Sequence, residues 1–277
     1  MKLTLGFSTC PNDTFIFDAL VHHKIDTESI DFEVLLADVE TLNQQAFDKQ
    51  IDITKISYHA FAHLVDSYSL LDSGSALGFG NGPLLISKRK IYPDEVQYAR
   101  IAIPGKLTTA NLLLSIAFPD ILERKEYVFS QIEEAILSGE VDAGVIIHEN
   151  RFTYSAKGLQ KIIDLGENWE KKTNLPIPLG GIIVNKSLPI KIQQTINRVL
   201  RRSVEFAQSN PQSAYFYVKN YAKEMDDTVI YNHIKLYVNE FTTSLGEKGK
   251  QAINTLFEQA MKSKIIPPNT QVSFVQS

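Results

Sequence analysis

Residues 144–154 have the sequence GVIIHENRFTY, in which an apolar run stops abruptly at an imidazole. Val145, Ile146 and Ile147 are consecutive β-branched residues, a pattern typical of a strand buried on both faces of a parallel sheet. Such sheets bind ligands just beyond the carboxyl ends of their strands. The stretch therefore predicts an α/β fold with His148, which titrates near neutral pH, at the edge where such folds perform chemistry. A histidine that only caps the strand explains this stretch equally well.

Strand-like and helix-like segments alternate on both sides of this stretch, which predicts mostly parallel sheets with right-handed crossovers. Asp38 is expected to cap one helix, and Ser130 with Glu133 to form a capping box at another. The charged segment 123–126 is expected on a solvated helix or loop, and the chain after Pro189 is mainly helical. The expected strands cover residues 3–7, 32–36, 51–56, 84–86, 100–103, 127–129, 141–147 and 180–184.

The simplest architecture is two α/β lobes with a cleft between them. The alternation restarts after Pro93, so we expect lobe one to comprise residues 1–87 and 187–277, and lobe two residues 88–186. The helical tail would pack on one of the two α/β units. Two crossings of the chain form a natural hinge, and clefts between domains are preferred ligand sites.

Two loops of the expected first lobe carry polar side chains to this cleft. Asn12 and Asp13 lie at a helix start, where amide, hydroxyl and N–H groups suit an anion or sugar-like hydroxyls, although an ordinary helix cap is the simpler explanation. Lys55 can attract a carboxylate, and Ser57 can cap a helix or hold a ligand.

Two loops of the expected second lobe do the same. Thr108 and Thr109 follow a glycine loop and open a helix, which makes either a cap or an anion site. Arg151 is a candidate for bidentate carboxylate binding or a surface residue, and Tyr154 lies within the same turn.

Composition narrows the classes of function. A net charge of −4 over 277 residues gives no support for nucleic-acid binding, but it permits a pocket for an anionic small molecule. The single cysteine, Cys10, excludes an internal disulfide and a multi-thiolate metal site. His59 and His63 have a metal-compatible spacing without a His-Glu-x-x-His motif, so we expect no metal. The absence of a signal-peptide pattern and of a membrane-spanning apolar run predicts a cytoplasmic protein without a membrane partner.

Together the loops resemble the 1,4-dihydroxy-6-naphthoate synthases of the futalosine route to menaquinone. The order and spacing of seven blocks match that family, from the first strand to beyond residue 180. These blocks are Ser8–Phe17, Asp38–Asn43, Ile56–Ala60, Gly80–Leu84, Pro104–Ala110, Gly144–Tyr154 and Leu175–Gly181.

The resemblance implies a two-lobed fold of the type II periplasmic-binding-protein kind, with a central interdomain cleft and a double crossover. It implies that cyclic dehypoxanthine futalosine is converted to 1,4-dihydroxy-6-naphthoate with release of dihydroxyacetone. The family's proton acceptor falls on His148. Its substrate-contacting stretches fall on Lys55, Ile56 and Ser57, and on Thr109 and Ala110.

The chemistry agrees with the residues. Carbon–carbon cleavage that ends in an aromatic ring needs a base and stabilisation of oxyanions. It needs no redox cofactor, and the chain has no dinucleotide-binding fingerprint, so we expect no cofactor. Two alternatives remain: chorismate dehydration at an earlier step of the same pathway, and solute binding without catalysis.

Overall fold

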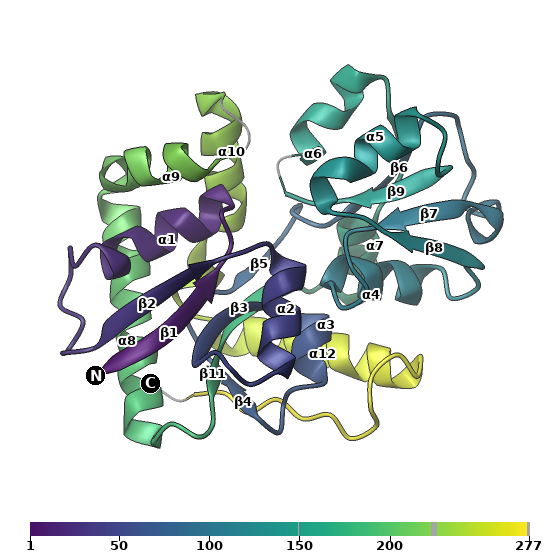
Figure 1. Ribbon diagram of the computed structural model, residues 1–277. Helices are drawn as coiled ribbons and strands as arrows, with labels where there is room; N and C mark the ends of the chain where they lie inside the picture. Colours follow the sequence, from purple (N-terminus) through teal and green to yellow (C-terminus); the bar gives the residue numbers. More distant parts are fainter. Residues whose placement is uncertain (149, 223–225, 276–277) are drawn as a thin grey trace.

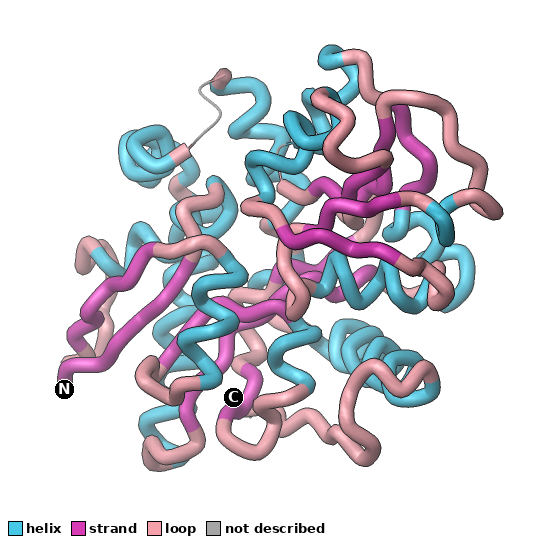
Figure 2. Tube along the Cα trace, turned by 45° about the vertical axis from the view of Figure 1, so that its right-hand side comes forward, coloured by secondary structure: helices cyan, strands magenta, loops and turns pink. Residues whose placement is uncertain are grey.

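Two β-sheets form the frame of the protein (Figure 1). The computed structural model describes residues 1–148, 150–222 and 226–275. In Figure 2 the strands gather in two separate groups, each with helices against it. Among the described residues, no helix is both long and apolar enough to cross a membrane.

The first sheet has the strand order β2-β1-β3-β11-β4, and β5 pairs with β11. Strands β1, β2 and β3 are parallel, as the alternating pattern predicted. The long strand β11 instead runs antiparallel to β3, β4 and β5, so the expectation of a mostly parallel sheet is wrong here. The strands are Lys2–Phe7 (β1), Asp31–Leu36 (β2), Ile53–Ser57 (β3), Tyr68–Leu70 (β4), Ala76–Gly78 (β5) and Ile177–Asn185 (β11).

The second sheet has the order β10-β6-β9-β7-β8. Strands β7, β8 and β9 are parallel, whereas β6 runs antiparallel to its neighbours β9 and β10. The strands are Leu84–Ser87 (β6), Arg100–Ile103 (β7), Glu123–Glu126 (β8), Ala143–Ile146 (β9) and Gln160–Asp164 (β10).

The charged segment Glu123–Glu126 corrects a sequence-based expectation, because it is strand β8 and not a solvated helix or loop. The strand expected at 127–129 is absent, and a short 3-10 helix begins at Phe129. β8 lies at the sheet edge, where charged side chains meet solvent and the apolar signal of a strand is lost.

The helices largely follow their expected positions. Asp38 caps α2 by accepting from the N–H groups of Glu40 and Thr41, as expected. The expected capping box at Ser130 is wrong, because α5 begins at Ile132 and Glu133 instead accepts from Asn150 and Lys157. The helices are Pro11–Val21 (α1), Val39–Phe47 (α2), Tyr58–Ala62 (α3), Thr109–Ala117 (α4), Ile132–Leu137 (α5), Asn150–Thr153 (α6), Leu165–Thr173 (α7), Ile190–Ser209 (α8), Tyr215–Tyr221 (α9), Asp227–Tyr237 (α10), Glu240–Thr243 (α11) and Gly246–Lys262 (α12).

The C-terminal helices pack on the first sheet, in agreement with the expected helical tail. On α8, the buried Ser203 hydroxyl donates to the carbonyl of Ile16 and accepts from the N–H of Leu20, which fastens α8 to α1. One apolar cluster joins β1, α1 and α8, and a small one lies between α5 and the second sheet. The largest cluster includes Phe61 and Phe257 as well as Leu112 and Val145, so it continues across the two sheets.

Sheet membership divides the chain earlier than the sequence predicted. The chain leaves the first sheet after Gly78 and enters the second at Leu84, then returns between Thr173 and Ile177. Boundaries at 87/88 and 186/187 would place β6 and β11 with the wrong sheets. We therefore propose that the lobes meet at residues 79–83 and 174–176.

Candidate active site

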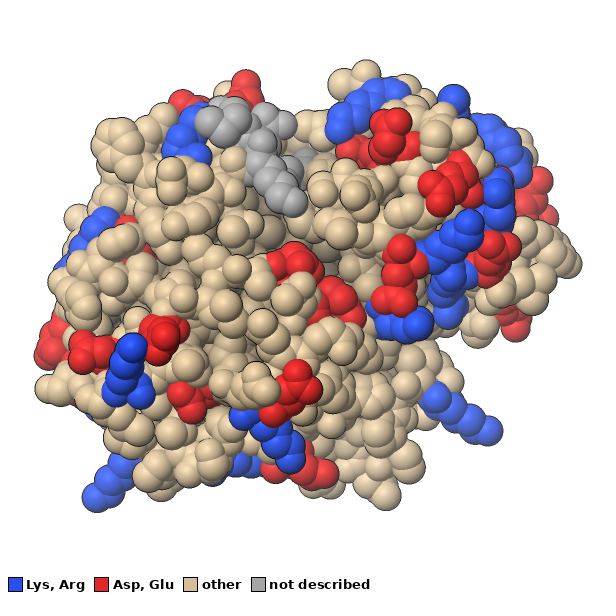
Figure 3. Space-filling model, viewed as in Figure 1, with Lys and Arg blue, Asp and Glu red and all other residues tan. Residues whose placement is uncertain are grey.

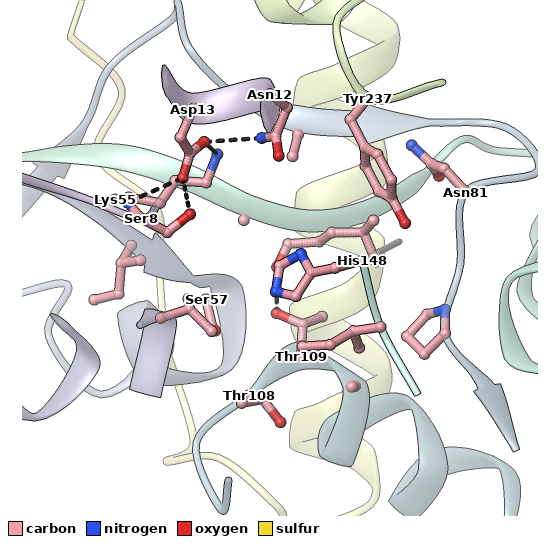
Figure 4. Close-up of a pocket in the computed structure, with 18 residues that line it drawn as sticks. Ser8, Asn12, Asp13, Lys55, Ser57, Asn81, Thr108, Thr109, His148 and Tyr237 are labelled. Atoms are coloured by element: carbon pink, nitrogen blue, oxygen red, sulfur yellow. Dashed lines mark hydrogen bonds and ion pairs between the residues drawn. The ribbon is translucent and has the colours of Figure 1, made fainter. Parts of the chain in front are cut away.

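A pocket lies between the two sheets, where polar residues from both converge (Figure 4). Its empty volume, which includes open solvent at its mouth, is about 650 Å³. It is lined by Ser8, Asn12, Asp13, Val39, Lys55, Ile56, Ser57, Ala76, Asn81, Pro83, Thr108, Thr109, Ala110, Ile147, His148, Leu179, Gly180 and Tyr237.

One wall of the pocket is a buried ion pair. Four donors converge on the Asp13 carboxylate: Lys55 Nζ at 2.8 Å, Asn12 Nδ2 at 2.8 Å, and the hydroxyl and N–H of Ser8 at 2.7 and 3.3 Å. The side chains of Lys55 and Asp13 are only 7% and 2% exposed. Because its lone pairs are occupied, Asp13 organises this wall and holds the Lys55 ammonium in place.

Ser57 ends β3 and is oriented by a neighbouring amide. Asn43 Oδ1 accepts the Ser57 N–H at 2.9 Å, and Asn43 Nδ2 donates to Ser57 Oγ at 3.2 Å. Since Oγ accepts this bond, the hydroxyl proton of Ser57 is directed elsewhere, and Ser57 lines the pocket. The side chain thus presents a hydrogen-bond donor to the pocket.

We expect Ser57→Ala to raise KM for the substrate by about 3- to 10-fold and to change kcat little, because it removes one neutral hydrogen bond. The free energy of unfolding should not change, because Asn43 Nδ2 keeps a partner in Glu40 at 3.0 Å. Steady-state kinetics measure the effect. Ser115→Ala, which removes a hydroxyl bonded within α4, is the control. Equal KM values for Ser57→Ala and wild type would contradict the contact.

The N-terminus of α4 forms the opposite wall. Thr108 caps this helix by accepting the N–H of Asn111. Thr109 and Ala110 occupy its first two positions, where N–H groups have no partner within a helix and favour anions. The Thr109 hydroxyl donates to the carbonyl of Leu179 on β11 at 2.5 Å, so it fastens α4 to the first sheet. The hydroxyl is therefore occupied within the protein, whereas the backbone N–H lies at the start of the helix.

His59 holds the loop before α4. Its Nδ1 lies 3.3 Å from the carbonyl of Thr108. Burial, and then the nearby His63, lower the pKa of His59 to about 4. The ring is thus neutral at pH 7 and donates a hydrogen bond across the cleft.

We expect His59 to lower the free energy of unfolding of the protein at acidic pH. Below the ordinary pKa of 6.5 the unfolded chain binds a proton at His59, whereas the folded protein does so only near pH 4. Stability therefore falls as pH decreases through this window, by about 3 kcal/mol in total from this group. His59→Gln keeps a donor but cannot titrate, so its urea-unfolding free energy should change less between pH 6.5 and 4. An identical pH dependence in the variant would contradict this assignment.

His148 lies two residues beyond β9, at the centre of the pocket lining in Figure 4. Its backbone is left-handed, with φ of +58°, a conformation uncommon for a residue other than glycine. Its Nδ1 is 3.5 Å from Cys10 Sγ, and its ring meets the Phe129 ring edge to face at 4.9 Å. Strained backbone held by such packing is characteristic of functional sites.

A second histidine, His233 on α10, stacks near His148 with ring centroids 6.2 Å apart. It is fully buried, and its Nε2 lies 2.9 Å from Asn12 Oδ1. Since Asn12 Nδ2 donates to Asp13, His233 must donate through Nε2. Burial, followed by His148 and Lys55, lowers the pKa of His233 well below 6.5. It is therefore a neutral ring, and its hydrogen bond orients Asn12, which in turn donates to Asp13.

Most of the sequence-predicted site residues come together here. Asn12, Asp13, Lys55, Ile56, Ser57, Thr109, Ala110 and His148 all line the pocket. Arg151 and Tyr154 do not. The Arg151 guanidinium binds the carboxylate of Asp164 and the carbonyl of Gly82, and Tyr154 packs against the apolar cluster beneath α5. The guanidinium of Arg151 is thus hydrogen-bonded to protein groups of β10 and of the 79–83 crossing. Glu149 lies outside the described residues.

Sequence reasoning missed three residues: Asn81, Tyr237 and His233. Asn81 lies in the block Gly80–Leu84, which supported the resemblance but was given no role in the site. Tyr237 and His233 belong to a helical region without a local motif, and their partners are far away in the chain. Among the described residues, no group of three or more His, Cys, Asp or Glu side chains is arranged to hold a metal ion.

The protein has two β-sheets flanked by helices, a polar pocket between the sheets and two crossings of the chain from one sheet to the other. These features define a fold of the periplasmic-binding-protein type. The alkanesulfonate-binding protein SsuA from Xanthomonas axonopodis, solved with MOPS bound, superposes with a TM-score of 0.74 over 98% of this chain and 96% of its own, at 11% identity. A crystal structure of protein AF1704 from Archaeoglobus fulgidus superposes with a TM-score of 0.91 at 37% identity, over 96% of this chain and 98% of that one.

Sequence comparison gives the family. The model of a family described as "Menaquinone biosynthesis" matches residues 3–262, and the chain belongs to this family. It is 41% identical to a Thermus thermophilus protein named 1,4-dihydroxy-6-naphthoate synthase, over 99% of both chains. A Streptomyces coelicolor protein of the same name is 39% identical, over 96% of this chain and 95% of its own.

Proposed function

We propose that this protein converts cyclic dehypoxanthine futalosine to 1,4-dihydroxy-6-naphthoate and dihydroxyacetone, as a carbon–carbon lyase of menaquinone biosynthesis in the cytoplasm. The relatives that carry the synthase name support this proposal, since both match nearly the whole chain. The substrate is an anionic small molecule. On the face seen in Figure 3, positive and negative side chains are interspersed, without a continuous basic surface for a polyanion.

The observation that carries the proposal is the placement of His148 beside the N-terminus of α4, within one pocket. The imidazole accepts the proton whose removal starts cleavage of the carbon–carbon bond. The Nδ1 atom of this ring lies 3.5 Å from Cys10 Sγ. The electron pair left by the departing proton passes into the substrate, and oxygen atoms of the substrate gain negative charge. The N–H groups of Thr109 and Ala110 stabilise that charge.

The remaining polar groups hold the substrate in position. Ser57 donates through its hydroxyl, and the Lys55 ammonium, fixed by Asp13, provides positive charge beside Ser8. Because Lys55 is already paired, it attracts a ligand carboxylate less than an unpaired lysine would.

The test is an assay of the purified protein with cyclic dehypoxanthine futalosine. Chromatography should show 1,4-dihydroxy-6-naphthoate and dihydroxyacetone appearing in equal amounts. Incubation with chorismate should leave it unchanged, whereas its dehydration would establish the alternative enzyme activity. Calorimetric binding of the substrate without turnover would establish a solute-binding protein and overturn the proposal.

A further inference from the structure

Asn81 is a buried amide with no hydrogen-bond partner. It lies in the crossing between β5 and β6, is 1% exposed, and lines the pocket. In the part of the chain that the structure describes, neither Nδ2 nor Oδ1 of Asn81 has a partner. Buried polar groups nearly always form hydrogen bonds, and a buried group without one is energetically unfavourable. A buried amide without a hydrogen-bond partner at a pocket therefore needs an explanation.

The protein fixes the backbone on both sides of Asn81. The N–H of Gly80 donates to Glu170 Oε1 at 2.7 Å, and Arg151 donates to the carbonyl of Gly82. Gly82 lies directly against Gly166, where an added Cβ would be 2.3 Å from the Gly166 Cα. Such fixation keeps Asn81 in the pocket before any ligand arrives, which reduces the entropy lost on binding.

We propose that Asn81 is a substrate-binding residue and that its amide binds an uncharged, hydroxyl-bearing part of the substrate. An amide has both donors and an acceptor, and so does a hydroxyl group, so hydroxyls can satisfy Nδ2 and Oδ1 together. A carboxylate only accepts and would leave Oδ1 unsatisfied. This inference rests on the proposed function and adds to it the position of the hydroxylated fragment.

The position of Asn81 agrees with this division of the substrate. In Figure 4, Asn81 and Tyr237 lie on one side of His148, and the Asp13–Lys55 pair lies on the other. The charged groups and the neutral amide thus flank the proposed base from opposite sides. A ligand that spans the pocket would place its hydroxylated fragment at Asn81 and the bond to be broken near His148.

Asn81→Leu gives a test that separates binding from structure. Leucine has a similar volume and removes the unsatisfied amide, so the melting temperature of the unliganded protein should equal or exceed that of wild type. KM for cyclic dehypoxanthine futalosine should rise by at least about 10-fold, as loss of a good polar contact does. A lower melting temperature or an unchanged KM would overturn the proposal. Turnover by the wild type separately tests the proposed function.

Asn197→Leu is the matched control. Asn197 is also buried, at 2% exposed, but its Oδ1 accepts the N–H groups of Asp72 and Ser73 away from the pocket. This variant should melt at a lower temperature and keep the wild-type KM. Asn81→Asp then tests the ligand chemistry, because a carboxylate accepts from hydroxyls but repels a carboxylate. A KM below that of Asn81→Leu supports the hydroxyl assignment, and a KM above it overturns that assignment.

Discussion

His148→Asn should lower kcat by roughly 10²- to 10⁴-fold, the usual effect of losing a positioned general base. Asparagine is chosen because it tolerates the left-handed backbone that His148 adopts, with φ of +58°. The substitution therefore removes the proposed proton acceptor without adding backbone strain. Substrate affinity and melting temperature should remain near those of wild type. The change of kcat/KM with pH in the range where histidines titrate should disappear in the variant.

His23→Asn is a matched control for this experiment. His23 is also a left-handed histidine, with φ of +52°, but it is exposed and lies outside the pocket lining. Its variant should retain the wild-type kcat. If His148→Asn kept most of its activity and melted at a lower temperature, His148 would be a structural residue at the end of a strand. The base would then have to be sought elsewhere in the pocket.

Asp13→Asn should lower the free energy of unfolding by about 3–5 kcal/mol, because it leaves a buried ammonium without its counter-charge. Lys55 and Asp13 are 2.8 Å apart and only 7% and 2% exposed, so the ammonium would lose most of the interaction that compensates its burial. The new amide would also direct N–H donors at one or more of the donors that now converge on Asp13. Urea unfolding measures the loss, and substrate binding should weaken because this wall of the pocket is disturbed.

Lys171→Met is the control for that variant. Lys171 pairs with Glu167 at 2.6 Å, but their side chains are 73% and 53% exposed. Exposed pairs contribute little, so the urea midpoint should remain at the wild-type value. If Asp13→Asn unfolded at the wild-type midpoint, solvent would have to reach Lys55, and the ion pair would not organise the pocket.

The sequence alone determined the class of fold and most of the pocket. Strand β9, which ends in the β-branched residues Val145 and Ile146, and the parallel arrangement of β1, β2 and β3 follow from local patterns of apolar residues. Parallel strands present their carboxyl ends at one edge of a sheet, so the polar residues that follow them were expected to gather. Asp13 and Ser57 do so at the first sheet, and His148, which follows a strand of the second sheet, lines the same pocket.

The tertiary structure decided what these residues can do. The Thr109 hydroxyl, a candidate ligand group by sequence, is bonded to Leu179, 70 positions along the chain. His233 supports Asn12 across 221 positions. Contacts between residues so far apart cannot be predicted from the local periodicity of apolar residues. Whether the amide of Asn81 has a partner likewise depends on how separate segments pack around it. Local preferences therefore set the strands and helices, whereas long-range packing sets which polar atoms remain for a ligand.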